Sequence, residues 1–523
     1  ILALVLGKFT PTTSVAVVPI SDKAMVDTLV HAKYVVPIVP ANTVYENYTI
    51  AVKNGRIVDI LPTVDAKSKY ASLNEENFTR DVVMPGFVNS HSHLGMSLMR
   101  GFADDYCLSD WLTKHIWPAE AVHVHPEFVD ASVSLGLAEM IRGGTTTTND
   151  MYWYPEVSSK VIDRAGLRAL IGLTVIDFPT SYAKSADEYI EKGLALYETM
   201  KEHPRIQFAM APHAPYTVCD EVLGRLKKLS QEKALRSLVP GEGPLNVSSR
   251  IHVHLHETKA EAVDSASLTP SMACHRSTHK CRPIENFDKN LKMLDQDLIA
   301  VHMTQLNADE IERLGATNSN VVHCATSNLK LASGFCPIAQ LARAGVNVAL
   351  GTDSTASNNG LDMLAETKLA AILSKAVAED ASVVPAFEAL QMATLNGARA
   401  LGMEKVTGSL EVGKSADMIT MRLEDIETLP LYNVFSHIVY SSTRDQVENV
   451  WVAGKRLMRQ RQLLTLDESS IKANSIKWGK VLADEKAKRD GKTDTPMTDA
   501  TAASKKRPAP EEAEQSAAVK AKI

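Results

Sequence analysis

The sequence predicts an α/β protein built around a (β/α)8 barrel of the TIM type, with a small β-sandwich domain formed from both the N- and C-terminal flanks. Two observations favour the barrel. Short β-like runs alternate with amphipathic helical patterns between residues 85 and 404, and about eight such repeats suit a closed barrel better than an open sheet. A third observation concerns the flanks, because all-β patterns lie on both sides of this region and can pair in one small domain.

The helical and strand-like segments alternate through the central region. Residues 127–142 form an amphipathic helical pattern, because Val129, Val133 and Leu137 share one stripe and Gly143–Gly144 ends it. Alternation of this kind indicates βα units around a parallel sheet. The clearest strand-like runs are Arg168–Asp177, Ile206–Pro212, Arg250–Glu257, Leu298–Thr304, Asn320–Ala325 and Val346–Asp353.

The flanks have a different pattern. Tyr34–Pro62 contains short strands around an Asn54–Gly55 turn, a pair that favours a hairpin. Strand-like runs return at Gly408–Leu423 and Val447–Met458. We therefore divide the chain into the N-terminal part of the β-sandwich domain (1–84), the barrel (85–404), the C-terminal part of the sandwich (405–470), a helical extension (471–489) and a disordered tail (490–523) that has almost no bulky apolar side chain.

Composition excludes several classes of protein. The net charge of −6 and the isoelectric point near 6.3 argue against a protein that binds nucleic-acid phosphates. No apolar run reaches the roughly 18 residues of a membrane span, and 6 cysteines in 523 residues are too few for a secreted disulfide framework. We expect a cytoplasmic protein without nucleic-acid or membrane partners. Lys505–Lys506–Arg507–Pro508 in the tail is either a nuclear-import signal or a solvated charge cluster.

Histidines gather at the ends of the predicted barrel strands, where barrel enzymes carry their chemistry. The first strand ends in His91 and His93, and residues two apart on a strand share a face, so both imidazoles should point into the barrel mouth. The fifth strand carries three histidines at alternate positions. Three inward imidazoles are hard to explain as core residues, but periodicity does not tell which of His252, His254 and His256 binds a metal.

Three further strands end in residues that could bind a metal. His302 and His323 close the sixth and seventh predicted strands, and Asp353 closes the eighth. An aspartate on the last strand, beside histidines from strands one, five and six, is the donor set of a metal site. His323 is not expected to be a ligand, although it could support the site from behind.

Four segments together resemble the amidohydrolase superfamily. Val83–His93 resembles its strand-one signature, and His256–Thr258, His323–Leu331 and Gly351–Ser354 are similar to the branch that deaminates 5′-methylthioadenosine and S-adenosylhomocysteine. Triazine hydrolases and guanine deaminases are neighbouring branches. The resemblance extends over most of the chain and implies a barrel enzyme that hydrolyses a C–N bond of a cyclic amidine.

The resemblance also implies a ligand set. In the family a metal-binding histidine precedes a catalytic glutamate by three residues, which selects His254 and Glu257. His91, His93 and Asp353 complete the ligands. The fourth predicted strand lacks the lysine that bridges two metals in binuclear subtypes. We therefore expect one divalent ion per chain, with Zn²⁺ as the first choice and Fe²⁺ acceptable to the same donors.

The resemblance further implies a role for each catalytic group. A divalent metal lowers the pKa of bound water from about 15.7 to roughly 7, and Asp353 can accept the proton that this water releases. His302 matches the second catalytic histidine and is expected to orient the attacking hydroxide. Glu257 is expected to protonate the ring nitrogen beside the attacked carbon and to help deliver a proton to the leaving ammonia. The product is the inosine analogue of an adenosine-type nucleoside.

Three more residues are expected to bind the substrate. Glu120 resembles the family's acid that holds the ribose diol, His213 matches a position that lines the nucleoside site, and Ser357 matches a position near the purine. Taken alone, Glu120 could also be a surface glutamate and His213 a core histidine. No arginine lies between Arg168 and Arg205 to bind the carboxylate of S-adenosylhomocysteine. This favours methylthioadenosine or adenosine, unless another loop or subunit supplies the arginine.

Other interpretations stay open. Within metal-dependent hydrolysis, the chain could be a guanine or triazine-type aminohydrolase or chlorohydrolase. In another class, it could be a metal-free, non-catalytic binding protein with an amidohydrolase-like fold. Residues 274–281 place two cysteines and two histidines close together, either as a second zinc site or within a flexible lid. The resemblance implies a homo-oligomer, a dimer or tetramer, that takes a small-molecule nucleoside.

Overall fold

The computed structural model describes residues 23–233, 238–239, 243–244, 250–263 and 281–489. The chain divides into two compact units, residues 1–479 and 480–523, and of the second unit the structure describes only the end of helix α17 (Glu468–Arg489). The expected tail with Lys505–Pro508, and most of the cysteine- and histidine-containing insertion, lie outside the described residues. No helix in the described part of the chain is both long and apolar enough to cross a membrane.

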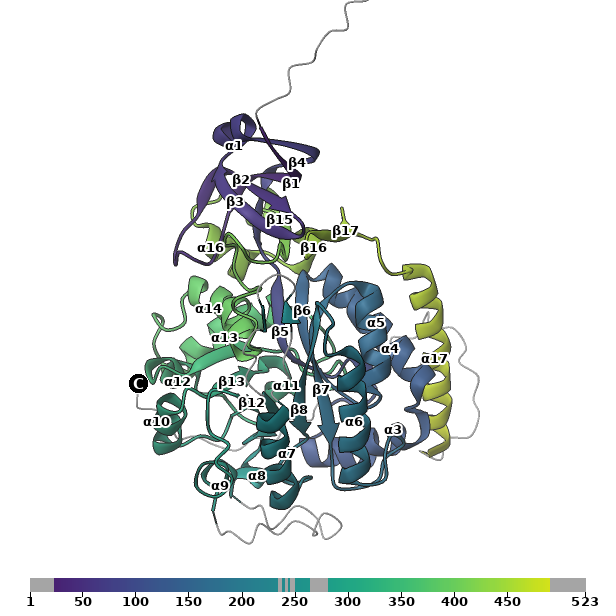
Figure 1. Cartoon of the computed structure of the whole chain (residues 1–523). Helices are drawn as coiled ribbons and strands as arrows, with labels where there is room; N and C mark the ends of the chain where they lie inside the picture. Colours follow the sequence, from purple (N-terminus) through teal and green to yellow (C-terminus); the bar gives the residue numbers. More distant parts are fainter. Residues whose placement is uncertain (1–22, 234–237, 240–242, 245–249, 264–280, 490–523) are drawn as a thin grey trace, which may run out of the picture. The chain divides into compact units, whose positions relative to one another are not determined.

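Eight parallel strands form the barrel at the centre of the first unit (Figure 1). Neighbouring strands follow one another in chain order. Ser92, at the end of the first strand, forms a parallel bridge with Asp353, just beyond the last strand, so the sheet closes on itself. The prediction of a (β/α)8 barrel is therefore confirmed. The strands are β5 (Phe87–Ser92), β6 (Thr145–Met151), β7 (Arg168–Val175), β8 (Ile206–Pro212), β11 (Ile251–Leu255), β12 (Leu298–His302), β13 (Asn320–His323) and β14 (Asn347–Leu350).

The barrel strands are apolar because both faces of the sheet are covered. Every residue of β12, with the sequence Leu-Ile-Ala-Val-His, is buried, as parallel strands between helices and a filled barrel interior require. Gly351 permits the closure between the last and first strands. A Cβ at this position would lie 2.9 Å from the backbone nitrogen of His91, so any side chain there would push the two strands apart.

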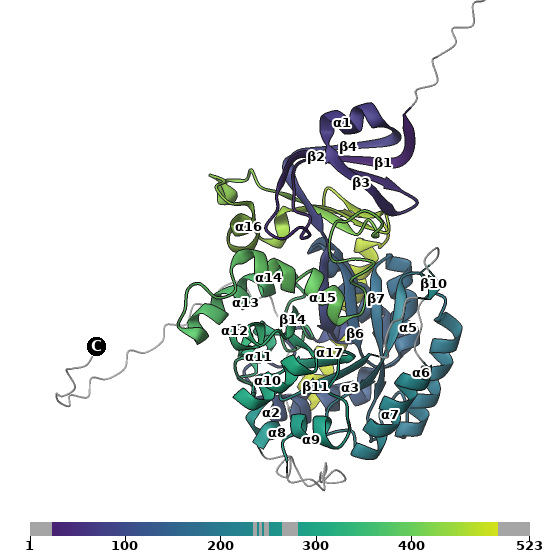
Figure 2. The same ribbon diagram turned by 60° about the vertical axis from the view of Figure 1, so that its left-hand side comes forward.

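Helices cover the outside of the barrel (Figures 1 and 2). The longest of them in the barrel, α4 (Pro126–Arg142), begins with a proline at its first position and ends at Gly143, as the amphipathic pattern predicts. The other helices that follow barrel strands are α5 (Pro155–Ala165), α6 (Ala186–Met200), α7 (Asp220–Lys233), α8 (Lys259–Val263), α9 (Pro283–Lys289), α10 (Ala308–Ala316), α11 (Ala325–Lys330), α12 (Ile338–Arg343), α13 (Met363–Ala378), α14 (Ala386–Met392) and α15 (Leu395–Ala400).

Between β5 and α4 the chain forms a series of short helical segments near the carboxyl ends of the strands. They include a 3₁₀ helix over Leu94–Met99, α2 (Leu108–Asp110), a π-helical turn over Trp111–Ile116 and α3 (Trp117–His123). The insertion before β11 contains, in its described part, the two-residue strands β9 (Leu238–Val239) and β10 (Gly243–Pro244). The long connection after β5 therefore lies where the active-site loops of a barrel belong.

The two flanks form one eight-stranded sheet, so the expectation of a small β domain built from both ends of the chain is confirmed. Its strand β4 (Tyr70–Pro85) pairs with β1 (Ala24–Val35) on one side and with β15 (Met418–Arg422) on the other. Arg56 also bridges Ser415, which curls the sheet around an apolar core. The remaining strands are β2 (Tyr45–Lys53), β3 (Arg56–Pro62), β16 (Val447–Val452), β17 (Lys455–Arg459) and β18 (Gln462–Leu463), and two short helices, α1 (Thr63–Lys69) and α16 (Val434–Ser436), lie between strands of the domain.

A buried ion pair joins the β domain to the barrel. Arg168 begins β7 and Asp417 precedes β15, and their side chains are 2.8 Å apart and buried. Asp417 also accepts hydrogen bonds from the Ser415 hydroxyl and the Ala453 N–H, both at 2.7 Å. Burial alone would raise the pKa of Asp417, but Arg168 and these donors hold it below its usual value. Asp417 is therefore an anion that depends on its partners.

Replacing Asp417 with alanine is expected to lower the free energy of unfolding by about 3–5 kcal/mol, because it leaves the Arg168 guanidinium buried without its counter-charge. Urea unfolding at pH 7 measures the difference from the unmodified protein. Asp288→Ala breaks the more exposed pair with Arg313 and serves as the control, with a far smaller loss expected. Equal losses in the two variants would contradict this role of Asp417.

Candidate active site

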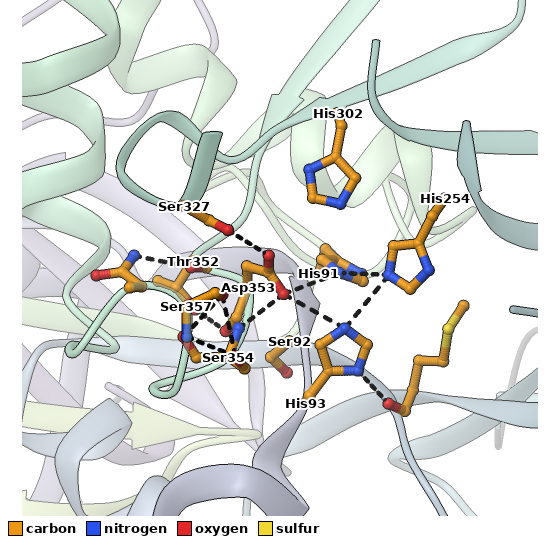
Figure 3. A network of polar contacts seen from close by, with 12 residues as sticks. His91, Ser92, His93, His254, His302, Ser327, Thr352, Asp353, Ser354 and Ser357 are labelled. Carbon is orange, nitrogen blue, oxygen red and sulfur yellow. Dashed lines mark hydrogen bonds and ion pairs between the residues drawn. The ribbon is translucent and has the colours of Figure 1, made fainter. Parts of the chain in front are cut away.

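Donor atoms from three strand ends meet at the mouth of the barrel (Figure 3). His91 lies in β5 with His93 just after it, His254 lies in β11, and Asp353 follows β14. The Nε2 atom of His254 is 3.2 Å from that of His91 and 3.3 Å from that of His93. Asp353 Oδ1 is 3.4 Å from His91 Nε2 and 3.3 Å from His93 Nε2. The structure thus brings together the four residues expected as metal ligands, here called the donor cluster.

Hydrogen bonds on the outer side of the donor cluster orient two of its rings. His254 Nδ1 donates to the carbonyl oxygen of His213 at 2.8 Å, and His93 Nδ1 donates to the carbonyl oxygen of Met151. A carbonyl oxygen only accepts, so Nδ1 carries the hydrogen in both rings and the Nε2 lone pair faces the cluster. Metal-binding histidines in proteins are held in this way.

The protonation states of the donor cluster suit a cation. His91 is fully buried, and its Nδ1 lies 2.8 Å from His252 Nε2. Burial lowers the pKa of His91 to about 4 and holds the pKa of His254 well below its ordinary value, so both rings are neutral. Burial alone would raise the pKa of Asp353. Its contacts with His91 and His93 outweigh burial, so the pKa of Asp353 lies below the usual range. The cluster therefore offers the neutral imidazoles of His91 and His254 and the carboxylate of Asp353.

The spacing of the four donors fits a divalent metal. Bonds from zinc to nitrogen or oxygen are about 2.0–2.1 Å long, so ligand atoms at the corners of a tetrahedron around zinc are about 3.3–3.4 Å apart. The four separations given above are 3.2–3.4 Å. Lone pairs that face one another this closely repel unless a cation lies between them. Imidazole and carboxylate donors suit zinc and other divalent transition metals.

Asp353 is held by a residue of helix α11 and by the residue that follows it in the chain. The Ser327 hydroxyl donates to its Oδ2 at 2.6 Å, and the Ser354 N–H donates to its Oδ1 at 2.8 Å. Its φ of 63° lies in the left-handed region, which costs a non-glycine residue of order 1–3 kcal/mol. A bond from its own N–H to the carbonyl oxygen of His91 at 3.0 Å supports this conformation. Closure of the barrel therefore also places the carboxylate.

His302 lies beside the donor cluster at the end of β12. Its Nδ1 is 2.8 Å from Asn328 Oδ1, so Nδ1 donates to the amide oxygen. Burial lowers the pKa of His302, which keeps the ring neutral and leaves Nε2 as an acceptor. One of its ring nitrogens lies within 4.8 Å of donor atoms of both His91 and His254. His302 can therefore contact anything that binds at the cluster.

Glu257 faces the same space from the segment after β11. Its Oε2 is 3.8 Å from His302 Nε2, and the residue is 4% exposed. Burial, with a contribution from the charge of Asp353, raises the pKa of Glu257 well above its ordinary value. Burial therefore favours the protonated form of the carboxyl group, the form that can act as a general acid.

A cavity of about 670 Å³, its open mouth included, extends from His93, His254 and Asp353 of the donor cluster toward the exterior. The three residues expected to bind substrate, Glu120, His213 and Ser357, all line it. Glu120 therefore lies in the wall of this cavity. The rest of the wall is mostly apolar and includes Met96, Leu108, Trp111, Leu112, Ile116 and Trp117.

Each residue expected to bind substrate has a polar neighbour. Glu120, on α3, accepts a hydrogen bond from the Tyr152 hydroxyl at 2.7 Å. Burial raises the pKa of Glu120 to about 7, and the Tyr152 contact opposes this rise. His213 Nδ1 is 2.9 Å from the hydroxyl of Thr217, and burial lowers the pKa of His213 to about 3. The Ser357 hydroxyl lies 3.0 Å from that of Ser354.

The expectation of three inward histidines on the fifth barrel strand is wrong for His256. The strand ends at Leu255, and His256 has a φ of 51°, so the chain turns before the third ring. His256 Nε2 accepts from the Ile284 N–H, and its Nδ1 donates to the Gln305 carbonyl, both at 3.2 Å. Both ring nitrogens of His256 thus have hydrogen-bond partners, and the residue has a structural role. His252 contacts the donor cluster through Nδ1 of His91.

Three residues of the site were not anticipated from the sequence. Ser327 and Asn328 lie within His323–Leu331, a segment that resembles the family. That resemblance could have indicated that they belong to the site. Tyr152 follows β6 and had no signal of its own. His323 is buried at the end of β13, and it is in neither of the two sets of donors, among the described residues, that are spaced to hold a metal.

The chain is similar in sequence to known proteins. Residues 82–457 match the model of the amidohydrolase family. A 5-methylthioadenosine/S-adenosylhomocysteine deaminase from Teredinibacter turnerae is 40% identical over 458 residues, 88% of this chain and 98% of that protein. A 5′-deoxyadenosine deaminase from Methanosarcina barkeri is 36% identical over 453 residues, 87% of this chain and 98% of that protein.

Solved structures share the fold as well. The crystal structure of an adenosine deaminase from Xanthomonas campestris with bound zinc has a TM-score of 0.82 and 44% identity, and covers 88% of this chain and 100% of the other. A triazine hydrolase variant and the guanine deaminase of E. coli have TM-scores of 0.76 and 0.71, over 86% and 83% of this chain and 99% and 100% of theirs. At 19% and 21% identity, these two show the fold alone.

Proposed function

The chain belongs to the amidohydrolase family and is a hydrolase of C–N bonds, and we propose that it deaminates adenosine-type nucleosides to the inosine analogue and ammonia. The proposal rests mainly on one structural observation. Glu257, a buried glutamate with a raised pKa, and the donor cluster face one cavity, which a second acid, Glu120, also lines. The relatives named for deamination of 5′-methylthioadenosine, S-adenosylhomocysteine and 5′-deoxyadenosine support the same class of substrate.

A divalent metal belongs to this chemistry, and we propose one zinc ion per chain, held by His91, His93, His254 and Asp353. The short separations between the donors and the zinc bound to the Xanthomonas campestris deaminase support this choice, although Fe²⁺ accepts the same donors. When bound, the ion supplies Lewis acidity that makes hydroxide available near neutral pH.

Asp353 and His302 act on the attacking water. Asp353, an anion, takes the proton that the water loses, while Ser327 keeps the carboxylate aimed. The Nδ1–H of His302 is engaged by Asn328, so the neutral ring offers Nε2 as an acceptor. A hydrogen bond from the water to this nitrogen orients the oxygen toward the carbon that bears the amino group.

Glu257 acts on the purine. Its carboxyl group donates a proton to the ring nitrogen next to the attacked carbon, which makes that carbon more electrophilic. When the C–N bond breaks, the proton held by Asp353 leaves with the amino group as ammonia. The Glu257 carboxylate recovers a proton from the new hydroxyl group as the carbonyl forms. One water is consumed, and both acids return to their starting states.

The lining of the cavity favours a nucleoside with an apolar 5′ end. Adjacent hydroxyl groups of a ribose can both donate to the Glu120 carboxylate, whereas guanine and triazines have no ribose to bind there. The described residues that line the cavity include no arginine or lysine. The carboxylate of S-adenosylhomocysteine therefore finds no counter-charge among them, and we propose that methylthioadenosine and adenosine are preferred.

Ammonia release from a panel of methylthioadenosine, adenosine, S-adenosylhomocysteine and guanine tests the proposed function. We expect turnover of the first two, a kcat/KM at least about tenfold lower for S-adenosylhomocysteine, since one charge-assisted contact is worth roughly 1.5–3 kcal/mol, and none for guanine. Guanine or a triazine as the best substrate would replace the proposed function by one of its rivals.

Replacing Glu120 with glutamine is expected to raise the KM for adenosine by about 10–100-fold, because charge-assisted hydrogen bonds to the diol are lost. The pKa of about 7 adds a pH dependence, since a protonated carboxyl accepts poorly. The KM of the unmodified enzyme should increase from pH 8 to pH 6, and that of the variant should not. Steady-state kinetics at pH 6, 7 and 8 measures both, and a flat KM in the unmodified enzyme contradicts the role of Glu120.

Three expectations from the sequence remain proposals. These are a homo-oligomer (a dimer or tetramer), a cytoplasmic location, and domain boundaries at residues 84, 404 and 470. Light scattering after size-exclusion chromatography tests the first of them.

A further inference from the structure

Glu261, on helix α8, makes an unusual contact with the segment that carries Glu257. The residue is 2% exposed. Its Oε1 accepts a hydrogen bond from the N–H of His256 and its Oε2 accepts one from the N–H of Glu257, both at 2.8 Å. One buried carboxylate therefore holds the two consecutive peptide groups that lead into the catalytic acid.

The backbone at this point needs such support. His256 is in the left-handed region, with a φ of 51°, which costs of order 1–3 kcal/mol in a non-glycine residue. The opposite side of the same segment is also held, because the Thr304 hydroxyl donates to the carbonyl oxygen of Glu257 at 2.7 Å and the Thr304 N–H donates to that of His256 at 2.9 Å. The peptide of Glu257 is thus fixed at both its N–H and its carbonyl.

We propose that Glu261 is a positioning residue, whose two carboxylate oxygens fix the turn at His256 and so hold the Glu257 carboxyl at the distance from the substrate that proton transfer requires. The inference rests on the proposed function, in which Glu257 is the acid. Catalytic groups must be held to within about 0.5 Å of the productive geometry, and a misplacement of about 1 Å costs about 10²-fold in rate.

Only the ionised carboxyl of Glu261 offers both oxygens as acceptors; burial raises its pKa to about 7, and the two backbone N–H contacts oppose that rise. A glutamine of the same size has one acceptor oxygen and one NH₂ group. In Glu261→Gln, the backbone N–H of either His256 or Glu257 would therefore face the NH₂ group, which is itself a donor. We expect Glu261→Gln, tested as the full chain loaded with Zn²⁺, to lower kcat for methylthioadenosine deamination by about 10²-fold, with KM and bound zinc within about twofold of the unmodified values.

Asp362 provides the matched control. Its carboxylate also accepts from two backbone N–H groups, those of Leu364 and Ala365, at the start of α13, but neither belongs to the proposed catalytic set. Asp362→Asn makes the same chemical change, but both N–H groups bond to Oδ1, which the amide keeps, so we expect kcat unchanged within about twofold. A loss of kcat of the same size in Asp362→Asn would show that Glu261 has no special role.

A double-mutant cycle separates positioning from general damage. If Glu261 acts through Glu257, then Glu261→Gln should cause no further loss of turnover in a Glu257→Gln background. An additional loss of about 10²-fold in that background, or a kcat within twofold of the unmodified value in the single variant, would overturn the proposal. Normal deamination by Glu257→Gln alone would instead overturn the proposed function, so the two failures are distinguishable.

Glu261→Asp supplies the test if the glutamine variant does not fold. It keeps two acceptor oxygens but shortens their reach by one methylene. We expect a kcat lowered by about tenfold with an unchanged KM, and an unchanged kcat at a lowered melting temperature would overturn the proposal.

Discussion

Replacing Glu257 with glutamine should lower the turnover of methylthioadenosine by about 10²–10⁴-fold, the range that general acid catalysis contributes, while the purified protein keeps its metal. Glutamine fills the same space but has no acidic proton for the ring nitrogen. Burial raises the pKa of Glu257 and keeps that proton available in the unmodified chain. Ammonia release gives the turnover, and elemental analysis gives the metal content.

His302→Asn should behave similarly, because it removes the acceptor that orients the attacking water and leaves the donor cluster intact. Glu198→Gln is the control for both, since it changes an exposed glutamate on α6 that pairs with Lys201, and normal kinetics are expected. Deamination at the normal rate by either the Glu257 or the His302 variant would show that its role is misassigned.

Replacing His254 with alanine should abolish both metal retention and turnover. His254 Nε2 lies 3.2 and 3.3 Å from the Nε2 atoms of His91 and His93, so its removal opens the donor cluster on one side. A site with three donors in place of four holds a divalent ion less tightly. Metal content after dialysis measures the loss directly, without reference to activity.

His256→Gln is the matched control for this second prediction. His256 is two residues further along the chain, but its ring nitrogens contact Ile284 and Gln305, so the variant should retain the metal. Equal metal content in the His254 and His256 variants would mean that the ligand set is wrong.

Part of the site followed from local spacing. Residues two apart on a strand share a face, and strand ends in a barrel converge, so His91, His93 and Asp353 could be placed at one mouth before any coordinates. The same rule failed for His256, because β11 ends at Leu255 and the left-handed turn breaks the alternation. Periodicity holds only as far as the strand, and the end of a strand depends on its neighbours.

The contacts that orient the catalytic groups could not be predicted in this way. Asn328 meets His302, and Ser327 meets Asp353, across 26 residues in each case. Such contacts depend on how helix α11 lies against the ends of β12 and β14, which no pattern within one segment encodes. The joining of both flanks in one sheet was foreseen, since β patterns on either side of a barrel have few other partners. The pairing of β4 with both β1 and β15 was not.

Ammonia release from methylthioadenosine, followed as Zn²⁺ is added back to chelator-treated protein, tests most directly whether this chain is a metal-dependent deaminase. We predict no turnover without metal and a linear rise that saturates at one ion per chain. Full turnover by folded, metal-free protein, or no ammonia at any metal content, would contradict it.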